Sequence, residues 1–149
     1  MAEINLSQVE ADELMAMEKH RADENCYYYP GPRTSLVVPL ISADKREAFL
    51  LDANRRSINI NRYTYMNRVR TVVILARLDV EGPPHRNPDG IELPTPHLHL
   101  YREGFNDKWA YSIPTDKFSN VTNPWLTLEE FMRFCNITLP PYIERGMFV

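Results

Sequence analysis

The pattern of hydrophobic and polar positions predicts two helices that flank a long β region. Residues 8–21 repeat apolar positions at helical spacing, and Ser7 with Glu10 has the form of a capping box at the start of this helix. A second, short helix is expected at 128–135, after another capping box at 127–130. The chain then closes in an extended C-terminal tail, whose apolar residues indicate that it packs against the body.

Residues 34–113 carry the alternating or continuous apolar patterns of β-strands. Four strands are expected before a long loop at 82–96, and two more form a hairpin after it. The expected ranges are 34–42, 46–53, 57–65, 68–81 and the two halves of 95–114. The sequence therefore predicts an α+β fold, in which a twisted antiparallel sheet of five or six strands is covered on one face by the terminal helices.

The hairpin at 95–114 places His97 and His99 on one face of its first strand. One register pairs His97 with Ile113 and His99 with Tyr111, which would make this face largely aromatic. The opposite face would be small and apolar, so the hairpin is expected in the centre of the sheet with both faces covered. Under this favoured interpretation, the two imidazoles are hydrogen-bonded groups of the core.

The same two histidines also support two chemical hypotheses. As an acid–base pair they would cleave a phosphodiester, with an arginine holding the phosphate, and the catalytic candidates are then His85, His97, His99 and Arg102. As metal ligands they would use the HxH spacing. However, no Asp, Glu or Cys stands at a spacing that completes a zinc set, so neither a metal site nor a cofactor is predicted.

Composition narrows the class of protein. A chain of 149 residues with 44% hydrophobic and 25% charged residues is the size of a single soluble domain, here expected to span residues 1–149. No run approaches the ~18 apolar residues that cross a membrane, and the acidic N-terminus is unlike a secretory signal. Cys26 and Cys135 lie far apart and are expected as free thiols. From these three features we expect a cytoplasmic location.

Charge is unevenly distributed along the chain, whose net charge is −3. Residues 45–102 hold ten basic and six acidic groups, and every basic group there except Lys45 is an arginine. Interleaved with tyrosines, the arginines of 55–70 suit a single-stranded nucleic acid. The candidate binding residues are Arg55, Arg56, Arg68, Arg70, His85 and Arg86. The favoured alternative is an exposed strand protected from aggregation by its charge.

Several segments together resemble a known group of sequences. They are "SADKREAFLLD", "RVRTVVILARLDVEGPPHRNPDG", "PHLHLYREGFNDKWAY" and "FMRFCNI". The chain resembles an uncharacterised family of small bacterial proteins, a domain of unknown function found in genomes and on mobile elements. The resemblance covers most of the chain and implies one compact domain, but no activity, substrate or catalytic residue. Small proteins of mobile elements such as phages are often toxins, antitoxins, regulators or inhibitors of host machinery.

Three functional hypotheses follow, and the function itself stays unknown at this point. The favoured one is a non-enzymatic binding or inhibitor protein that acts on a host macromolecule, with a protein as the expected partner, through its sheet, its charged surfaces and the 82–96 loop. The second is a toxin-like ribonuclease that uses His97 and His99. The third is a nucleic-acid-binding regulator, with RNA or DNA bound at the arginine-rich strands 55–70.

Overall fold

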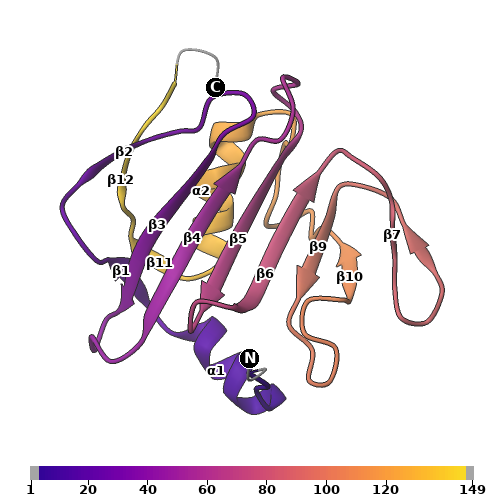
Figure 1. Cartoon of the computed structure of the whole chain (residues 1–149), viewed down its shortest axis with the longest axis horizontal. Helices are drawn as coiled ribbons and strands as arrows, with labels where there is room; N and C mark the ends of the chain where they lie inside the picture. The colour runs from indigo at the N-terminus through magenta and orange to yellow at the C-terminus, as the bar shows by residue number, and fades with distance from the viewer. Residues whose placement is uncertain (1–3, 147–149) are drawn as a thin grey trace.

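The computed structural model describes residues 4–146 and confirms the α+β class. One large sheet has eight strands in the order β10-β9-β6-β5-β4-β3-β1-β11 (Figure 1). Its strands are β1 (Lys19–Arg21), β3 (Ser35–Ser42), β4 (Ala48–Asn54), β5 (Tyr63–Val69), β6 (Val73–Val80), β9 (His97–Leu100), β10 (Ala110–Ser112) and β11 (Ile137–Leu139). The count exceeds the predicted five or six, because short strands from both ends of the chain extend the sheet at one edge.

The predicted extended tail supplies part of that extension. Strand β11 pairs with β1 in parallel, so the sheet is mixed rather than purely antiparallel. Strands β12 (Tyr142–Glu144) and β2 (Cys26–Tyr28) form a separate parallel pair. Residues 19–28 therefore lie beside residues 137–144, as Figure 1 shows for β1 and β2 next to β11 and β12.

The N-terminal helix α1 (Gln8–Ala16) ends earlier than predicted. Its capping box is present, since the Ser7 hydroxyl accepts from the Glu10 amide at 3.1 Å and the Glu10 carboxylate accepts from the Ser7 amide at 3.3 Å. The predicted end at residue 21 is wrong, because residues 19–21 pair with β3 as strand β1. Hydrogen bonding across the sheet overrides the helical pattern there.

The C-terminal helix α2 (Pro124–Phe134) begins four residues before the predicted 128–135. Asn123 is its N-cap and accepts from the Leu126 amide at 3.1 Å, and Pro124 occupies the first turn, where no amide proton is needed. The predicted capping box at 127–130 is wrong. Thr127 is fully buried, and its hydroxyl donates back to the Asn123 carbonyl at 2.8 Å within the helix.

The central strands also begin and end at other residues than predicted. Residues 57–62 form turns rather than the first part of a strand, and β5 starts at Tyr63. The predicted strand 68–81 is interrupted after Val69, where Arg70 and Thr71 adopt left-handed φ values of 50° and 66°. This turn joins β5 to β6 as a hairpin, so a continuous β-rich stretch of sequence folds back on itself.

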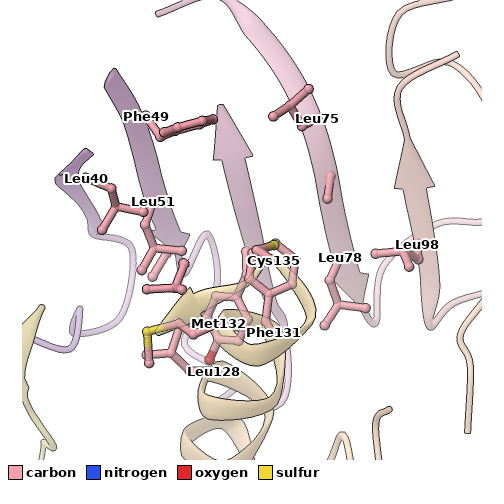
Figure 2. Packing of buried hydrophobic residues seen from close by; sticks show 14 of the residues in the cluster. Leu40, Phe49, Leu51, Leu75, Leu78, Leu98, Leu128, Phe131, Met132 and Cys135 are labelled. Atoms are coloured by element: carbon pink, nitrogen blue, oxygen red, sulfur yellow. The ribbon is translucent and has the colours of Figure 1, made fainter. Parts of the chain in front are cut away.

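Helix α2 packs on one face of the sheet, and the hydrophobic core lies between them. Leu128, Phe131, Met132 and Cys135 point from the helix towards the sheet, where Leu78 is among the residues that face them (Figure 2). Two buried tyrosines of β5 bind the backbone at the helix start, since the Tyr65 hydroxyl donates to the carbonyl of Pro124 at 2.8 Å and that of Tyr63 to Val121 at 2.6 Å. On the opposite face, β5, β6 and β9 carry polar side chains such as Thr64, Asp79 and His97, whereas β3 carries the apolar Val37, Pro39 and Ile41.

The histidine hairpin was predicted in the centre of the sheet, but it lies at the edge. Strand β9 pairs with β6 on one side and with β10 on the other, and β10 is the last strand. The register also differs by one residue from the predicted one, so His99 lies opposite Ala110 and His97 opposite Ser112. A shift of one residue exchanges the two faces of a strand. Small side chains, rather than aromatic rings, therefore lie beside the imidazoles.

The predicted 82–96 loop contains a small hairpin of β7 (His85–Arg86) and β8 (Glu92–Leu93), which projects from the edge of the sheet (Figure 1). The Asn87 side chain accepts from the Ala110 amide at 2.9 Å and donates to the Ala110 carbonyl at 3.0 Å, so it covers part of the exposed edge of β10.

Both cysteines are free thiols, as predicted. No helix in residues 4–146 is long and apolar enough to cross a membrane.

Candidate functional site

The face of the sheet opposite α2 carries two rows of polar residues that cross β5, β6 and β9. One row places Thr64 beside Asp79 and Asp79 beside His97. The next row places Arg77 beside His99. Because residues two apart on a strand share a face, these side chains converge on one point of the sheet.

Asp79 is the centre of this cluster. Its Oδ2 atom lies 3.1 Å from Nε2 of His97 and 3.2 Å from Nε2 of His99. The Thr64 hydroxyl donates to its other oxygen at 3.0 Å. His97 is 2% exposed and His99 is fully buried. The two imidazoles therefore turn the same nitrogen towards one carboxylate oxygen, and neither ring reaches bulk solvent.

The second nitrogen of each ring faces a backbone carbonyl. Nδ1 of His99 lies 2.8 Å from the carbonyl oxygen of Asp107, and Nδ1 of His97 lies 3.3 Å from that of Pro94. A carbonyl oxygen only accepts hydrogen bonds, so the Nδ1 atoms carry the protons that they donate. In a neutral imidazole of this tautomer, the Nε2 lone pair points into the cluster.

Arg77 supplies the positive charge of the cluster. One terminal nitrogen, Nη2, donates to Nε2 of His99 at 3.0 Å and lies 3.3 Å from Oδ2 of Asp79. The other, Nη1, binds the carboxylate of Asp107 at 3.1 Å. Burial would raise the pKa of Asp79, but the contacts of its carboxylate with His99, Arg77 and Thr64 outweigh burial and hold that pKa well below its usual value.

His85 closes the cluster from the side of the β7–β8 hairpin. Its ring centroid lies 4.6 Å from that of His99 and 5.9 Å from that of His97. Its Nε2 donates to the carbonyl of Lys108 at 2.7 Å. The hairpin therefore brings a third imidazole against the pair, although its Nε2 is directed to the backbone.

The set of Asp79, His97 and His99 can ligate a metal ion. One donor atom from each residue lies within 4.8 Å of the other two. Metal–ligand distances of about 2.1 Å place neighbouring donors roughly 3.0–3.4 Å apart in octahedral or tetrahedral coordination. The two Nε2–Oδ2 distances fall in that interval. Two histidines with one carboxylate are a known ligand set for Zn²⁺ and Fe²⁺ that leaves coordination positions open.

A pocket of about 300 Å³ opens beside this cluster. Asp79, His97, His85 and Arg77 form part of its wall, whereas His99 lies behind them. The remaining wall includes Arg56, Arg62 and Glu81 from the ends of β4, β5 and β6, together with Thr64 and the prolines that precede His85. A group bound at the open coordination positions would therefore enter from this pocket.

The other sequence-predicted residues are not brought into this cluster. The Arg102 guanidinium stacks on Trp109 at 4.4 Å from the ring centroid, and Arg102 lines a different pocket from the one beside His97. Arg86 pairs with Glu92 at 3.2 Å on the surface of the hairpin.

The candidate arginines of 55–70 are separated by the fold. Arg55 is 4% exposed and donates to the Pro30 carbonyl at 3.2 Å. Arg68 forms two hydrogen bonds of 2.9 Å with the buried carboxylate of Asp52. Arg70 pairs with Glu47 at 3.3 Å. Of the four, Arg56 alone lines the pocket beside the histidines.

Sequence reasoning did not find Asp79 and Arg77 as members of the cluster. Asp79 stands 18 residues before His97 and faces it only because β6 and β9 are neighbours in a defined register. The available signal was the alternation of Arg77 and Asp79 within an otherwise apolar strand. Two charged residues on one face of a central strand need partners on the adjacent strand.

Comparison with known proteins identifies the family but not an activity. No curated protein and no solved structure matches the chain. A family model described as "Family of unknown function (DUF6978)" matches residues 6–137, which include both helices and the whole histidine cluster. The chain belongs to this family of unknown function, DUF6978.

Proposed function

We propose that this protein binds a divalent transition-metal ion through Asp79, His97 and His99. The observation that carries the proposal is the convergence of two Nε2 atoms on one carboxylate oxygen, at 3.1 and 3.2 Å. In each ring, a backbone carbonyl holds the Nδ1 proton, which leaves the Nε2 lone pair directed inward. Hydrogen bonds from Nδ1 to a backbone carbonyl fix the tautomer and the orientation that metal-ligating histidines need.

Arg77 lies against two of the three proposed ligands, His99 and Asp79. Its guanidinium donates to the Nε2 lone pair of His99 at 3.0 Å, so a metal ion and Arg77 compete for the same nitrogen. The side chain is 27% exposed and also binds Asp107, so it can turn away from His99 while it keeps an ionic partner. The guanidinium thus neutralises Asp79 until a cation replaces it.

The test is a titration of chelator-treated protein with Zn²⁺ by calorimetry and with Co²⁺ by absorption. We expect one saturable site per chain. Asp79→Asn and His97→Gln should each lower the affinity by roughly 10–100-fold, whereas His20→Gln should have no effect. His20 is the matched control because it lies at the opposite edge of the sheet, bound to Glu18.

Two results would contradict the proposal. One is the absence of saturable binding to the wild-type protein. The other is an equal loss of affinity in His20→Gln and His97→Gln. A third variant, Arg77→Met, tests the competition directly, because removal of the guanidinium should tighten Zn²⁺ binding by roughly tenfold or about 1.4 kcal/mol. Weaker binding in Arg77→Met would mean that Arg77 orients the ligands instead of competing with the metal.

The functions expected from the sequence have less support from the geometry. An acid–base ribonuclease needs its imidazoles to reach the substrate, but the Nε2 atoms of His97 and His99 both face Asp79. A nucleic-acid surface needs free guanidinium groups, but Arg68 and Arg70 are paired with carboxylates. A protein partner, in a binding or inhibitor role, stays a prediction, for which the β7–β8 hairpin with its 63% exposed Ile91 is the place to test.

A further inference from the structure

The pocket beside the metal ligands has a rim of two arginines that the proposed metal site does not use. Arg56 follows β4 and Arg62 precedes β5, so both lie at the same end of the sheet, and both are exposed. Within residues 4–146, neither guanidinium has a carboxylate within ion-pair distance, whereas Arg77 in the same wall has two. Arginines that line a concave surface without a carboxylate partner are suited to bind an anionic group.

The backbone of the β6–β7 turn lies beside one of these arginines. Gly82 has a left-handed φ of 107°, and a β-carbon on it would lie 3.5 Å from Nε and Nη2 of Arg62. The guanidinium therefore lies along the turn, at the distance of an ordinary van der Waals contact. Its side chain is exposed and lines the wall of the pocket.

The charge of the pocket is positive once a metal is bound. Its wall holds Arg56, Arg62 and Arg77 against the carboxylates of Asp79 and Glu81, a balance of +1 with neutral histidines. Asn59 donates to the Glu81 carboxylate at 2.8 Å, which holds that group at the turn. A divalent ion raises the balance to +3, or to +2 when Arg77 turns away to Asp107, which favours a doubly charged anion.

We infer that the pocket binds a phosphomonoester group, whose oxygens fill the open metal positions and reach Arg56 and Arg62. This inference rests on the metal site proposed above. Planar guanidinium groups bind phosphate through two parallel hydrogen bonds, and a divalent ion neutralises the remaining charge. A volume of about 300 Å³ lies at the lower end of ligand pockets, so the rest of the ligand is small or extends into solvent.

The test uses phenyl phosphate as the probe and Co²⁺-loaded protein, observed by phosphorus NMR. A phosphorus nucleus within a few ångströms of Co²⁺ is strongly broadened, whereas the Zn²⁺-loaded protein gives the diamagnetic reference. Calorimetry on the Zn²⁺-loaded protein supplies the affinity. We expect broadening with the wild type, at least tenfold weaker phenyl phosphate binding without metal, and at least tenfold weaker binding in the double variant Arg56→Ser, Arg62→Ser.

Matched controls separate the possible failures. Arg46→Ser removes an exposed arginine at the β3–β4 turn, at the opposite end of these strands, and should bind phenyl phosphate as the wild type does. The double variant should keep its Zn²⁺ affinity, because neither arginine is a ligand. Metal binding without phosphorus broadening would overturn the phosphate inference alone. Loss of Zn²⁺ binding in the wild type would overturn the metal proposal and the inference that rests on it.

The choice of anion has its own control. Benzoate has the same ring with a single negative charge and a planar carboxylate. If benzoate binds the Zn²⁺-loaded protein as tightly as phenyl phosphate, the pocket is a carboxylate site and the inference is wrong. We expect phenyl phosphate to bind at least tenfold more tightly, because it carries a second negative charge and a third terminal oxygen.

Discussion

Replacement of Lys19 by methionine is expected to lower the free energy of unfolding by about 3 kcal/mol. Lys19 is fully buried, and its ammonium group donates to three carbonyls: Met15 at 2.8 Å, Met17 at 3.0 Å and Cys135 at 2.7 Å. The first two lie at the end of α1, and Cys135 is the C-cap of α2. One ammonium group therefore caps the negative ends of both helices.

The magnitude follows from two opposing terms. Burial lowers the pKa of Lys19 from 10.5 to about 8, which corresponds to a cost of about 3 kcal/mol for the charged form. Methionine relieves this cost. However, it leaves one buried and two half-buried carbonyls without a donor, at about 2 kcal/mol each, or about 6 kcal/mol together. The net loss is about 3 kcal/mol, a large fraction of the stability of a domain of this size.

The assay is urea denaturation followed by tryptophan fluorescence at pH 7, with Lys117→Met as the control for an exposed lysine. The pH dependence supplies a second test. Below pH 8 Lys19 is protonated in the folded and unfolded states, so its burial cost is present in full. Between pH 8 and 10.5 the folded protein binds fewer protons than the unfolded chain, so the wild type gains stability relative to Lys19→Met.

Two outcomes would refute this account of Lys19. Equal stability of Lys19→Met and the wild type at pH 7 would show that the three hydrogen bonds contribute no net stability. Above pH 8, the difference in free energy of unfolding between the wild type and Lys19→Met should widen by up to about 3 kcal/mol. If this difference narrows instead, the carbonyls favour the charged form of Lys19 more than burial disfavours it.

Three further predictions concern the core, the helix start and the metal site. Tyr65→Phe should lower the free energy of unfolding, measured by urea denaturation, by about 1–3 kcal/mol. The Tyr65 hydroxyl lies 2.8 Å from the Pro124 carbonyl oxygen and 2.6 Å from the Tyr29 hydroxyl, and both groups lose this partner. Tyr111→Phe on the surface should leave the free energy of unfolding unchanged. Asn123→Ala should cost about 1 kcal/mol in thermal unfolding, because it removes the N-cap of α2, and an unchanged midpoint would contradict the cap assignment. Zn²⁺ at about 100 times its dissociation constant should stabilise the protein by about 2.7 kcal/mol, and coincident melting curves with and without Zn²⁺ would count against the metal site.

Local sequence alone determined the elements that need only neighbouring residues. The capping box of Ser7 and Glu10 forms as predicted, because both partners lie within one turn of helix. The α+β class followed from the long β-patterned region between helical ends. The β3–β4 hairpin also lies close to its predicted range, since its strands are separated by a short polar turn.

The predicted ends of the helices were wrong where tertiary contacts outweigh the local preference of the sequence. Residues 19–21 continue a helical pattern, yet they pair with β3 because Lys19 finds three carbonyl acceptors in the core. The capping motif at 127–130 was a valid local pattern, but Asn123 and Pro124 start the helix earlier and bury Thr127. The sequence offered two possible starts for this helix, and packing against the sheet favours the start at Asn123 over the one at Thr127.

The candidate site depends on strand register, which the sequence left open. A hairpin register shifted by one residue would have placed Tyr111 and Ile113, rather than Ala110 and Ser112, beside the histidines. The carboxylate that completes the ligand set comes from β6, and its distance in sequence gives no sign of its 3.1 Å contact with His97. The residue types that can hold a metal were visible in the sequence. Their convergence was decided by the pairing of β6 with β9, because side chains on neighbouring strands meet only when register and face agree.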